Sequence, residues 1–228
     1  EAIRSVVEAR PDQEVLVSGS MRLTNRELLR RIETLSNGLA GMGLQKGDKL
    51  VLLLPPGPEF VYLFFALASL GAVVVPLNPD IHERGLREVL EDARPAALVA
   101  SRSRWDDEFR QAHGLRHIIP VEGEGQDLTL AALMKDSARA QPPVPVAPDD
   151  LLALLYTSGT TGKPKATMHT HRSLIAAVVA TLKVRELWLR PSNLRTAMEA
   201  AKALARYRSR LMRSIGRPQT FLSCSRDC

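Results

Sequence analysis

Two patterns of apolar positions alternate along the first 182 residues of the chain. Short continuous apolar runs are typical of buried strands, and they occur at residues 50–54, 72–75, 97–100, 117–121 and 151–155. Between these runs, apolar residues recur at helical spacing, at residues 24–43, 59–70, 81–93, 172–181 and more weakly 105–113. A short helix over 3–9 and a hairpin over 14–23 precede them. This alternation predicts an α/β fold with a mainly parallel sheet flanked by helices.

The first long helix carries its own start and stop signals. Thr24 followed by Glu27 is a capping box, which predicts that the helix begins there. The residues of its apolar face are Leu28, Ile32, Leu35, Leu39 and Met42. Gly43 suits the carboxyl-terminal cap, so one face of this helix is predicted to pack on the core.

Residues 60–77 contain no charged side chain, which is close to the length of a membrane span. Gly71 interrupts the stretch, and four residues after it favour a strand over a helix. We therefore expect a buried helix followed by a buried strand, and no membrane span.

The residues after the last apolar run have the chemistry of a phosphate-binding loop. The candidate binding residues are Thr157, Ser158, Gly159, Thr160, Thr161, Gly162, Lys163 and Lys165. Glycines let a backbone approach a ligand and turn its N–H groups inward. Hydroxyls donate hydrogen bonds to phosphate oxygens, and lysines add positive charge. Together these residues predict a cradle for the phosphates of a nucleotide such as ATP.

Two simpler explanations of this loop were weighed. A Walker A loop needs a glycine at position 157 and Ser or Thr at 164, where this chain has Thr157 and Pro164. A solvent-exposed turn between two strands would explain the glycines, but it does not call for two lysines and four hydroxyls in nine residues.

The segment Ser158-Gly159-Thr160-Thr161-Gly162-Lys163-Pro164-Lys165 resembles the signature loop of adenylate-forming, or AMP-binding, enzymes. This family includes acyl-CoA synthetases, luciferases and peptide-synthetase adenylation domains. Residues 23–28, 47–51 and 71–79 also resemble family landmarks, so the resemblance runs from about Val15 to about Leu182. Ala166 departs from the family, which usually has glycine there; alanine would be strained if this position required a positive φ.

The resemblance implies an AMP-forming acid–thiol ligase similar to acyl-CoA synthetases, including those of fatty acid metabolism. Such an enzyme activates a small carboxylic acid as an acyl-adenylate and passes the acyl group to a thiol. The implied cofactors are ATP and Mg²⁺, with coenzyme A as the thiol. No catalytic residue and no metal ligand can be assigned, because the family's catalytic lysine has no counterpart here. The identity of the acid is not readable from the sequence.

Residues 183–228 differ from the rest of the chain. Residues 172–228 carry 12 Lys and Arg against 3 Asp and Glu, whereas residues 1–171 carry 19 against 22; together they give the net charge of +6. We expect a partial AMP-binding large domain over 1–182, with a Pro-rich linker at 138–148, and a basic tail over 183–228. The family's adenine, ribose and catalytic-lysine segments have no counterpart, so a truncated enzyme with an unrelated or out-of-frame tail is expected.

The tail leaves two further hypotheses open. Its apolar residues fall near helical spacing with arginines between them, so it could form a basic helix that binds anionic membranes or nucleic acid. Nucleic acid is the less expected partner, because the domain itself is not basic. The other hypothesis is an inactive gene remnant.

The remaining polar clusters favour structural roles. His169 and His171 would share one face if a strand continued through them, and they lack the spacing of a zinc motif. The acidic cluster at 106–108 suits a helix start. Both cysteines, Cys224 and Cys228, lie at the end of the chain, which together with the absence of a signal peptide favours the cytoplasm.

Overall fold

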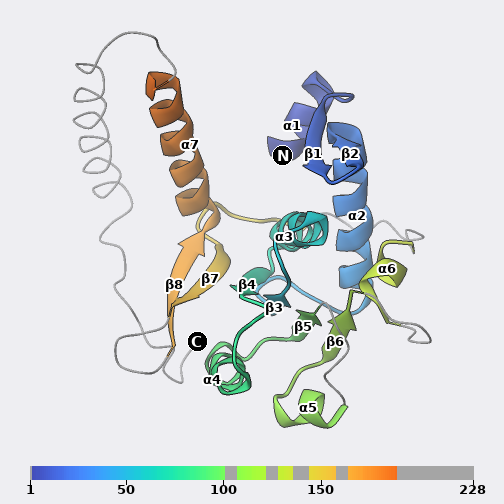
Figure 1. Cartoon of the computed structure of the whole chain (residues 1–228), viewed down its shortest axis with the longest axis vertical. Coiled ribbons are helices and arrows are strands. Elements are labelled where there is room, and N and C mark those ends of the chain that lie inside the picture. Colours follow the sequence, from blue (N-terminus) through green and yellow to red (C-terminus); the bar gives the residue numbers. More distant parts are fainter. Residues whose placement is uncertain (1, 101–106, 122–127, 136–143, 158–163, 189–228) are drawn as a thin grey trace.

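A computed structural model describes residues 2–100, 107–121, 128–135, 144–157 and 164–188 (Figure 1). Six strands form one sheet: β3 Lys49–Leu53, β4 Val73–Leu77, β5 Ala97–Ala100, β6 His117–Pro120, β7 Leu151–Thr157 and β8 Lys165–Thr170. Their order across the sheet is β6-β5-β3-β4-β7-β8. The first five strands run parallel, and only β8 is antiparallel to its neighbour. The predicted mainly parallel α/β fold is confirmed.

Helices cover both faces of this sheet. The described helices are α1 Ala2–Ala9, α2 Asn25–Gly41, α3 Pro58–Leu70, α4 Glu83–Ala93, α5 Asp107–Ala112, α6 Leu130–Leu133 and α7 His171–Trp188. Helices α2 and α3 lie on one side of the central strands, and α4 and α5 lie on the other (Figure 1). A separate hairpin of β1 Glu14–Ser18 and β2 Met21–Thr24 packs near α2.

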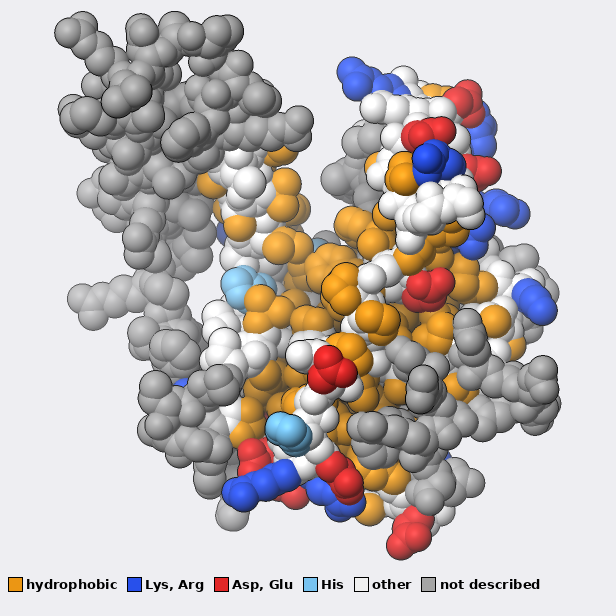
Figure 2. Space-filling view, viewed as in Figure 1, with side chains coloured by type: hydrophobic (Ala, Val, Ile, Leu, Met, Phe, Trp, Pro, Cys, Tyr) orange, Lys and Arg blue, Asp and Glu red, His pale blue; other side chains and the backbone are white. Residues whose placement is uncertain are grey.

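Helix α7 follows β8 directly and presents apolar side chains to solvent. Ile175, Val178, Val179 and Leu182 are all exposed, and Figure 2 shows hydrophobic side chains along the described part of this helix. Leu174, in contrast, packs against the core. The helix is therefore fixed at its start, next to β8, while its later turns have an apolar surface.

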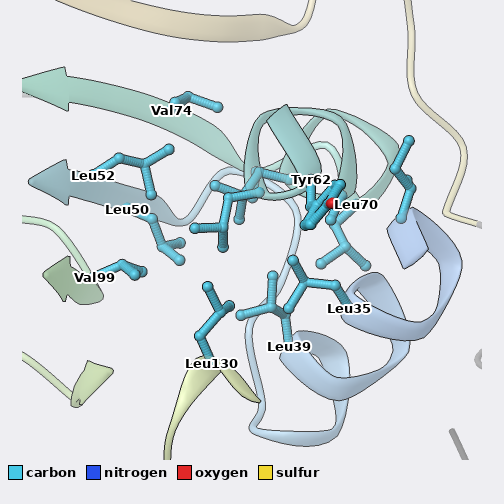
Figure 3. Packing of buried hydrophobic residues seen from close by; sticks show 14 of the residues in the cluster. Leu35, Leu39, Leu50, Leu52, Tyr62, Leu70, Val74, Val99 and Leu130 are labelled. Carbon is cyan, nitrogen blue, oxygen red and sulfur yellow. The ribbon is translucent and has the colours of Figure 1, made fainter. Parts of the chain in front are cut away.

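Leucines from both layers build the larger core cluster. Leu35 and Leu39 of α2 meet Leu50 and Leu52 of β3, and Tyr62 of α3 lies beside them (Figure 3). The four leucines are fully buried, and each such side chain contributes about 1.5–3 kcal/mol of stability relative to exposure. This packing holds the sheet's upper face against α2 and α3.

A second cluster lies between the sheet and α4. Val51 and Val75 from the strands pack with Leu86 and Leu90 of α4, and all four are buried. Tyr156 and Ala166, from β7 and β8, pack at the edge of this cluster. The second cluster thus connects α4 to the pair of strands that carries the predicted loop.

The predicted helix signals are present in the structure. The Thr24 side chain accepts a hydrogen bond from the Glu27 N–H, and the Glu27 carboxylate accepts one from the Thr24 N–H, completing the capping box. These bonds lower the pKa of Glu27. Gly71 ends α3 with φ 67°, and Ala72 begins the return to β4. Within the described ranges, no helix is long and apolar enough to cross a membrane.

Two described elements are absent from the sequence prediction. Strand β8 lies where a loop was expected, and the four-residue helix α6 follows Thr129, whose side chain caps it. The last strand before the loop also runs two residues further than expected, to Thr157.

Candidate functional site

The candidate site lies at the end of the β7–β8 hairpin. The two strands pair antiparallel, with Thr157 opposite Lys165 and Tyr156 opposite Ala166. Of the predicted binding residues, the structure describes these first and last members, Thr157 and Lys165. The others, Ser158, Gly159, Thr160, Thr161, Gly162 and Lys163, lie outside the described residues.

This end of the hairpin belongs to the carboxyl edge of the parallel sheet. Strand β7 runs parallel to β4, with Ala153 opposite Val74, so Thr157 lies at the same edge as Leu77. In open α/β sheets, ligands bind outside the carboxyl ends of the strands. The loop that follows Thr157 therefore begins where such a fold places a ligand.

Thr157 and Lys165 lie on the same face of the hairpin. Residues directly opposite each other in an antiparallel pair project to the same side. The Thr157 side chain is exposed and that of Lys165 is half-buried. Their hydroxyl and ammonium groups thus flank the loop from its two ends, where a phosphate could accept hydrogen bonds from both.

The neighbouring pair, Tyr156 and Ala166, projects to the opposite face. Both pack against the cluster under α4. The Tyr156 hydroxyl donates a hydrogen bond to Asp92 Oδ2 at 2.5 Å, across 64 positions of sequence. The sequence analysis missed this contact, because no spacing pattern connects a residue of α4 with the end of β7.

Ala166 is not strained. It lies within β8, and Arg94 is the only described non-glycine residue with a positive φ. The condition under which alanine would be unfavourable at this position is therefore not met, and Ala166 continues the strand.

Ion pairs hold the other end of the hairpin. Arg172 donates to both carboxylate oxygens of Asp149, at 2.7 and 2.9 Å, and Lys46 lies 2.6 Å from Asp150. The Arg172 hydrogen bond lowers the pKa of Asp149, and the Lys46 hydrogen bond lowers that of Asp150. These contacts connect the start of β7 with the start of α7 and with the turn before β3.

The two histidines lie near these ion pairs and away from the loop. His169 is in β8 opposite Ala153, while His171 is the first residue of α7, so one strand does not continue through both. Burial lowers the pKa of His171, and its Nε2 atom is buried without a hydrogen-bond partner. The acidic cluster does mark a helix start, since α5 begins at Asp107; Asp106 is outside the described residues.

Nothing in the described part of the chain provides a preformed metal centre, because it contains no group of three His, Cys, Asp or Glu side chains able to hold an ion. Mg²⁺ often binds through substrate phosphates and water rather than in an all-protein cage. A hydroxyl and an ammonium group at the loop ends are suited to the phosphates themselves.

Comparison with known proteins identifies related sequences and folds. A family model for "AMP-binding enzyme" matches residues 3–200, which extends beyond Leu182. An olefin β-lactone synthetase of Stenotrophomonas maltophilia is 35% identical over 166 residues, covering 68% of this chain and 29% of that protein. A long-chain-fatty-acid–CoA ligase of Mycobacterium tuberculosis is 32% identical over 187 residues, covering 80% and 37%.

The structural comparison agrees. The crystal structure of VinN superposes with a TM-score of 0.70 at 29% identity, covering 81% of this chain and 46% of VinN. The chain thus spans about a third of the length of these two curated relatives and less than half of the solved structure.

Proposed function

The chain belongs to the AMP-binding enzyme family, and from this premise we propose that the segment from Thr157 to Lys165 binds the phosphate chain of ATP. We further propose that the whole protein is an AMP-forming acid–thiol ligase, similar to acyl-CoA synthetases. It would join a carboxylic acid to the adenylate of ATP, release pyrophosphate, and transfer the acyl group to coenzyme A.

One observation carries the phosphate-binding proposal. Thr157 and Lys165 are cross-strand partners at the carboxyl edge of the sheet, at the two ends of a segment with two glycines and a second lysine. A hydroxyl and an ammonium group on one face can bind neighbouring oxygens of a polyphosphate. The spacing of this pair does not depend on the other six residues.

Each residue type has a distinct role in the proposed site. Lys165, with Lys163, would neutralise charge on the β- and γ-phosphates, and Thr157 would donate a hydrogen bond. Gly159 and Gly162 would allow backbone N–H groups to approach the phosphate oxygens. ATP supplies the electrophilic α-phosphorus, and the chain's contribution is to hold the departing pyrophosphate in position.

The acid and its acceptor belong to the same proposal. The relatives are a β-lactone synthetase and a CoA ligase by name, and both names are compatible with carboxylate activation. The proposal follows the CoA ligase, which matches the larger share of this chain, and a cytoplasmic location rests on the two terminal cysteines. An olefin β-lactone synthetase activity is the second candidate function, favoured by the higher identity of that relative.

Calorimetric titration tests the phosphate site. We expect the double variant Lys163→Ala/Lys165→Ala to bind Mg·ATP and pyrophosphate at least about tenfold more weakly than the unmodified chain, because charge-assisted hydrogen bonds contribute about 1.5–3 kcal/mol each. Lys135→Ala is the matched control, since Lys135 is exposed and follows α6. Equal affinities in the double variant and the control, at equal thermal stability, would refute the assignment.

The alternative that residues 183–228 bind anionic surfaces is tested separately. Binding of DNA or anionic vesicles through the basic segment should weaken steeply between 50 and 200 mM salt, on the order of 10³-fold for six or more phosphate contacts on DNA. Strong binding with this salt dependence, and no ATP binding, would favour the binding-only function.

A further inference from the structure

The hydrogen bond from Tyr156 to Asp92 joins two elements that support different parts of the domain. Asp92 lies in the last turn of α4, a helix held to the sheet by buried Leu86, Val89 and Leu90. Tyr156 is the penultimate residue of β7. The bond is 2.5 Å long, partly buried, and formed between a phenol and a carboxyl group, which are features of a strong hydrogen bond.

The end of the hairpin has few other fixed contacts on its two sides. Leu155 and Met168 are 40% and 55% exposed, and Thr157 is exposed as well. Strand β8 is at the edge of the sheet, paired only with β7. Among the side chains of the described part of this end, those of Tyr156 and Ala166 reach the core cluster under α4.

The register connects this bond to the proposed phosphate site. Tyr156 is adjacent to Thr157 along the chain, and Ala166, opposite Tyr156, is adjacent to Lys165. A movement of Tyr156 away from α4 would therefore displace both Thr157 and Lys165. Because binding of phosphate by two groups requires their spacing and orientation to be set beforehand, such a movement weakens binding without unfolding the domain.

We propose that Tyr156 is a positioning residue, and that its hydrogen bond to Asp92 holds Thr157 and Lys165 in place for phosphate binding. This inference rests on the proposed function, because it requires that the hairpin end binds phosphate. Tyr156 does not itself contact the phosphate; it acts through the backbone of β7 and through α4.

The test compares three variants of the bond. Tyr156→Phe removes the hydroxyl and keeps the ring in the cluster, Asp92→Ala removes the acceptor, and Asp92→Asn keeps an oxygen that can accept the same hydrogen bond. Affinity for Mg·ATP and for pyrophosphate is measured by calorimetry on the full chain, together with the thermal midpoint of each variant.

We expect Tyr156→Phe and Asp92→Ala each to weaken binding about five- to tenfold, with Asp92→Asn closer to the unmodified chain. The double variant Tyr156→Phe/Asp92→Ala should bind no more weakly than either single variant, because both remove one interaction. Tyr62→Phe is the matched control: its hydroxyl lies 3.7 Å from Met21 Sδ, in the core beneath α3, and its loss should not change the affinity.

The outcomes separate this inference from the function on which it rests. If Lys163→Ala/Lys165→Ala weakens binding but Tyr156→Phe and Asp92→Ala bind as the unmodified chain does, the positioning role is wrong and the phosphate site stands. An Asp92→Asn variant as weak as Asp92→Ala would also overturn the positioning role. If the unmodified chain binds neither Mg·ATP nor pyrophosphate, the proposed site and this inference both fall.

Discussion

His171 lies among charged side chains at the start of α7, and its imidazole is partly buried. Asp150, which favours the protonated imidazole, and Lys46, which opposes it, are its charged neighbours. Burial outweighs the attraction of Asp150, so the pKa of His171 falls below its ordinary value of 6.5. At the residue scale, this group therefore couples the stability of the hairpin to pH.

We expect the free energy of unfolding to decrease as the pH falls from 7 to 5. The unfolded chain then binds a proton at His171 that the folded chain resists, so stability is fully present above about pH 6.5 and declines below it. Urea unfolding at several pH values should show a shallower decline in His171→Gln than in the unmodified chain. Identical pH dependence in the two proteins would contradict the role of His171.

At the scale of elements, continuous apolar runs identified the central strands because a strand buried on both faces tolerates few polar residues. The capping box at Thr24 and Glu27 likewise located the start of α2. Strand β8, however, reads Lys-Ala-Thr-Met-His-Thr, and an exposed edge strand needs no apolar run. It is a strand because it pairs with β7, and that contact is not encoded in its own composition.

The candidate site shows the same division. The residue types from Thr157 to Lys165 predicted a phosphate loop, and the structure adds that its two ends are cross-strand partners. The link between Tyr156 and Asp92 depends on how α4 crosses the sheet. Contacts between distant segments of this kind follow from the packed fold, so single-sequence reasoning does not reach them.

Helices α3 and α7 differ in how much of their apolar surface is packed. Leu67 of α3 is fully buried, whereas Leu182 of α7 is 51% exposed. We expect Leu67→Ala to lower the free energy of unfolding by about 2–5 kcal/mol, and Leu182→Ala by about 0.5 kcal/mol or less. Denaturant unfolding of both variants makes the comparison. A large loss in Leu182→Ala would show that a further segment covers α7.

At the scale of the whole molecule, the chain corresponds to part of each relative. It covers 29% of the β-lactone synthetase and 37% of the CoA ligase. Its proposed contacts are to the phosphates of ATP, and none of its described residues is assigned to the adenine, the ribose or the acid. Binding and turnover are therefore separate expectations for this chain.

We expect the 228-residue chain alone not to catalyse acyl-adenylate formation. In-line attack requires an aligned α-phosphorus, and misplacement by about 1 Å can reduce a rate by about a hundredfold. The measurement is carboxylate-dependent exchange of labelled pyrophosphate into ATP, with acetate, fatty acids, aromatic acids and amino acids as substrates. Exchange above a protein-free blank with any of these acids would contradict this expectation.

The most direct test of the central claim is to locate the bound phosphate by NMR. Titration of the ¹⁵N-labelled chain with Mg·ATP, and in parallel with pyrophosphate, reports on each assigned backbone amide. The phosphate-site assignment predicts that the largest shifts in both titrations fall on residues 157–165, Gly159 and Gly162 among them. Shifts confined to the basic residues after 183, or no shifts at all, would contradict it.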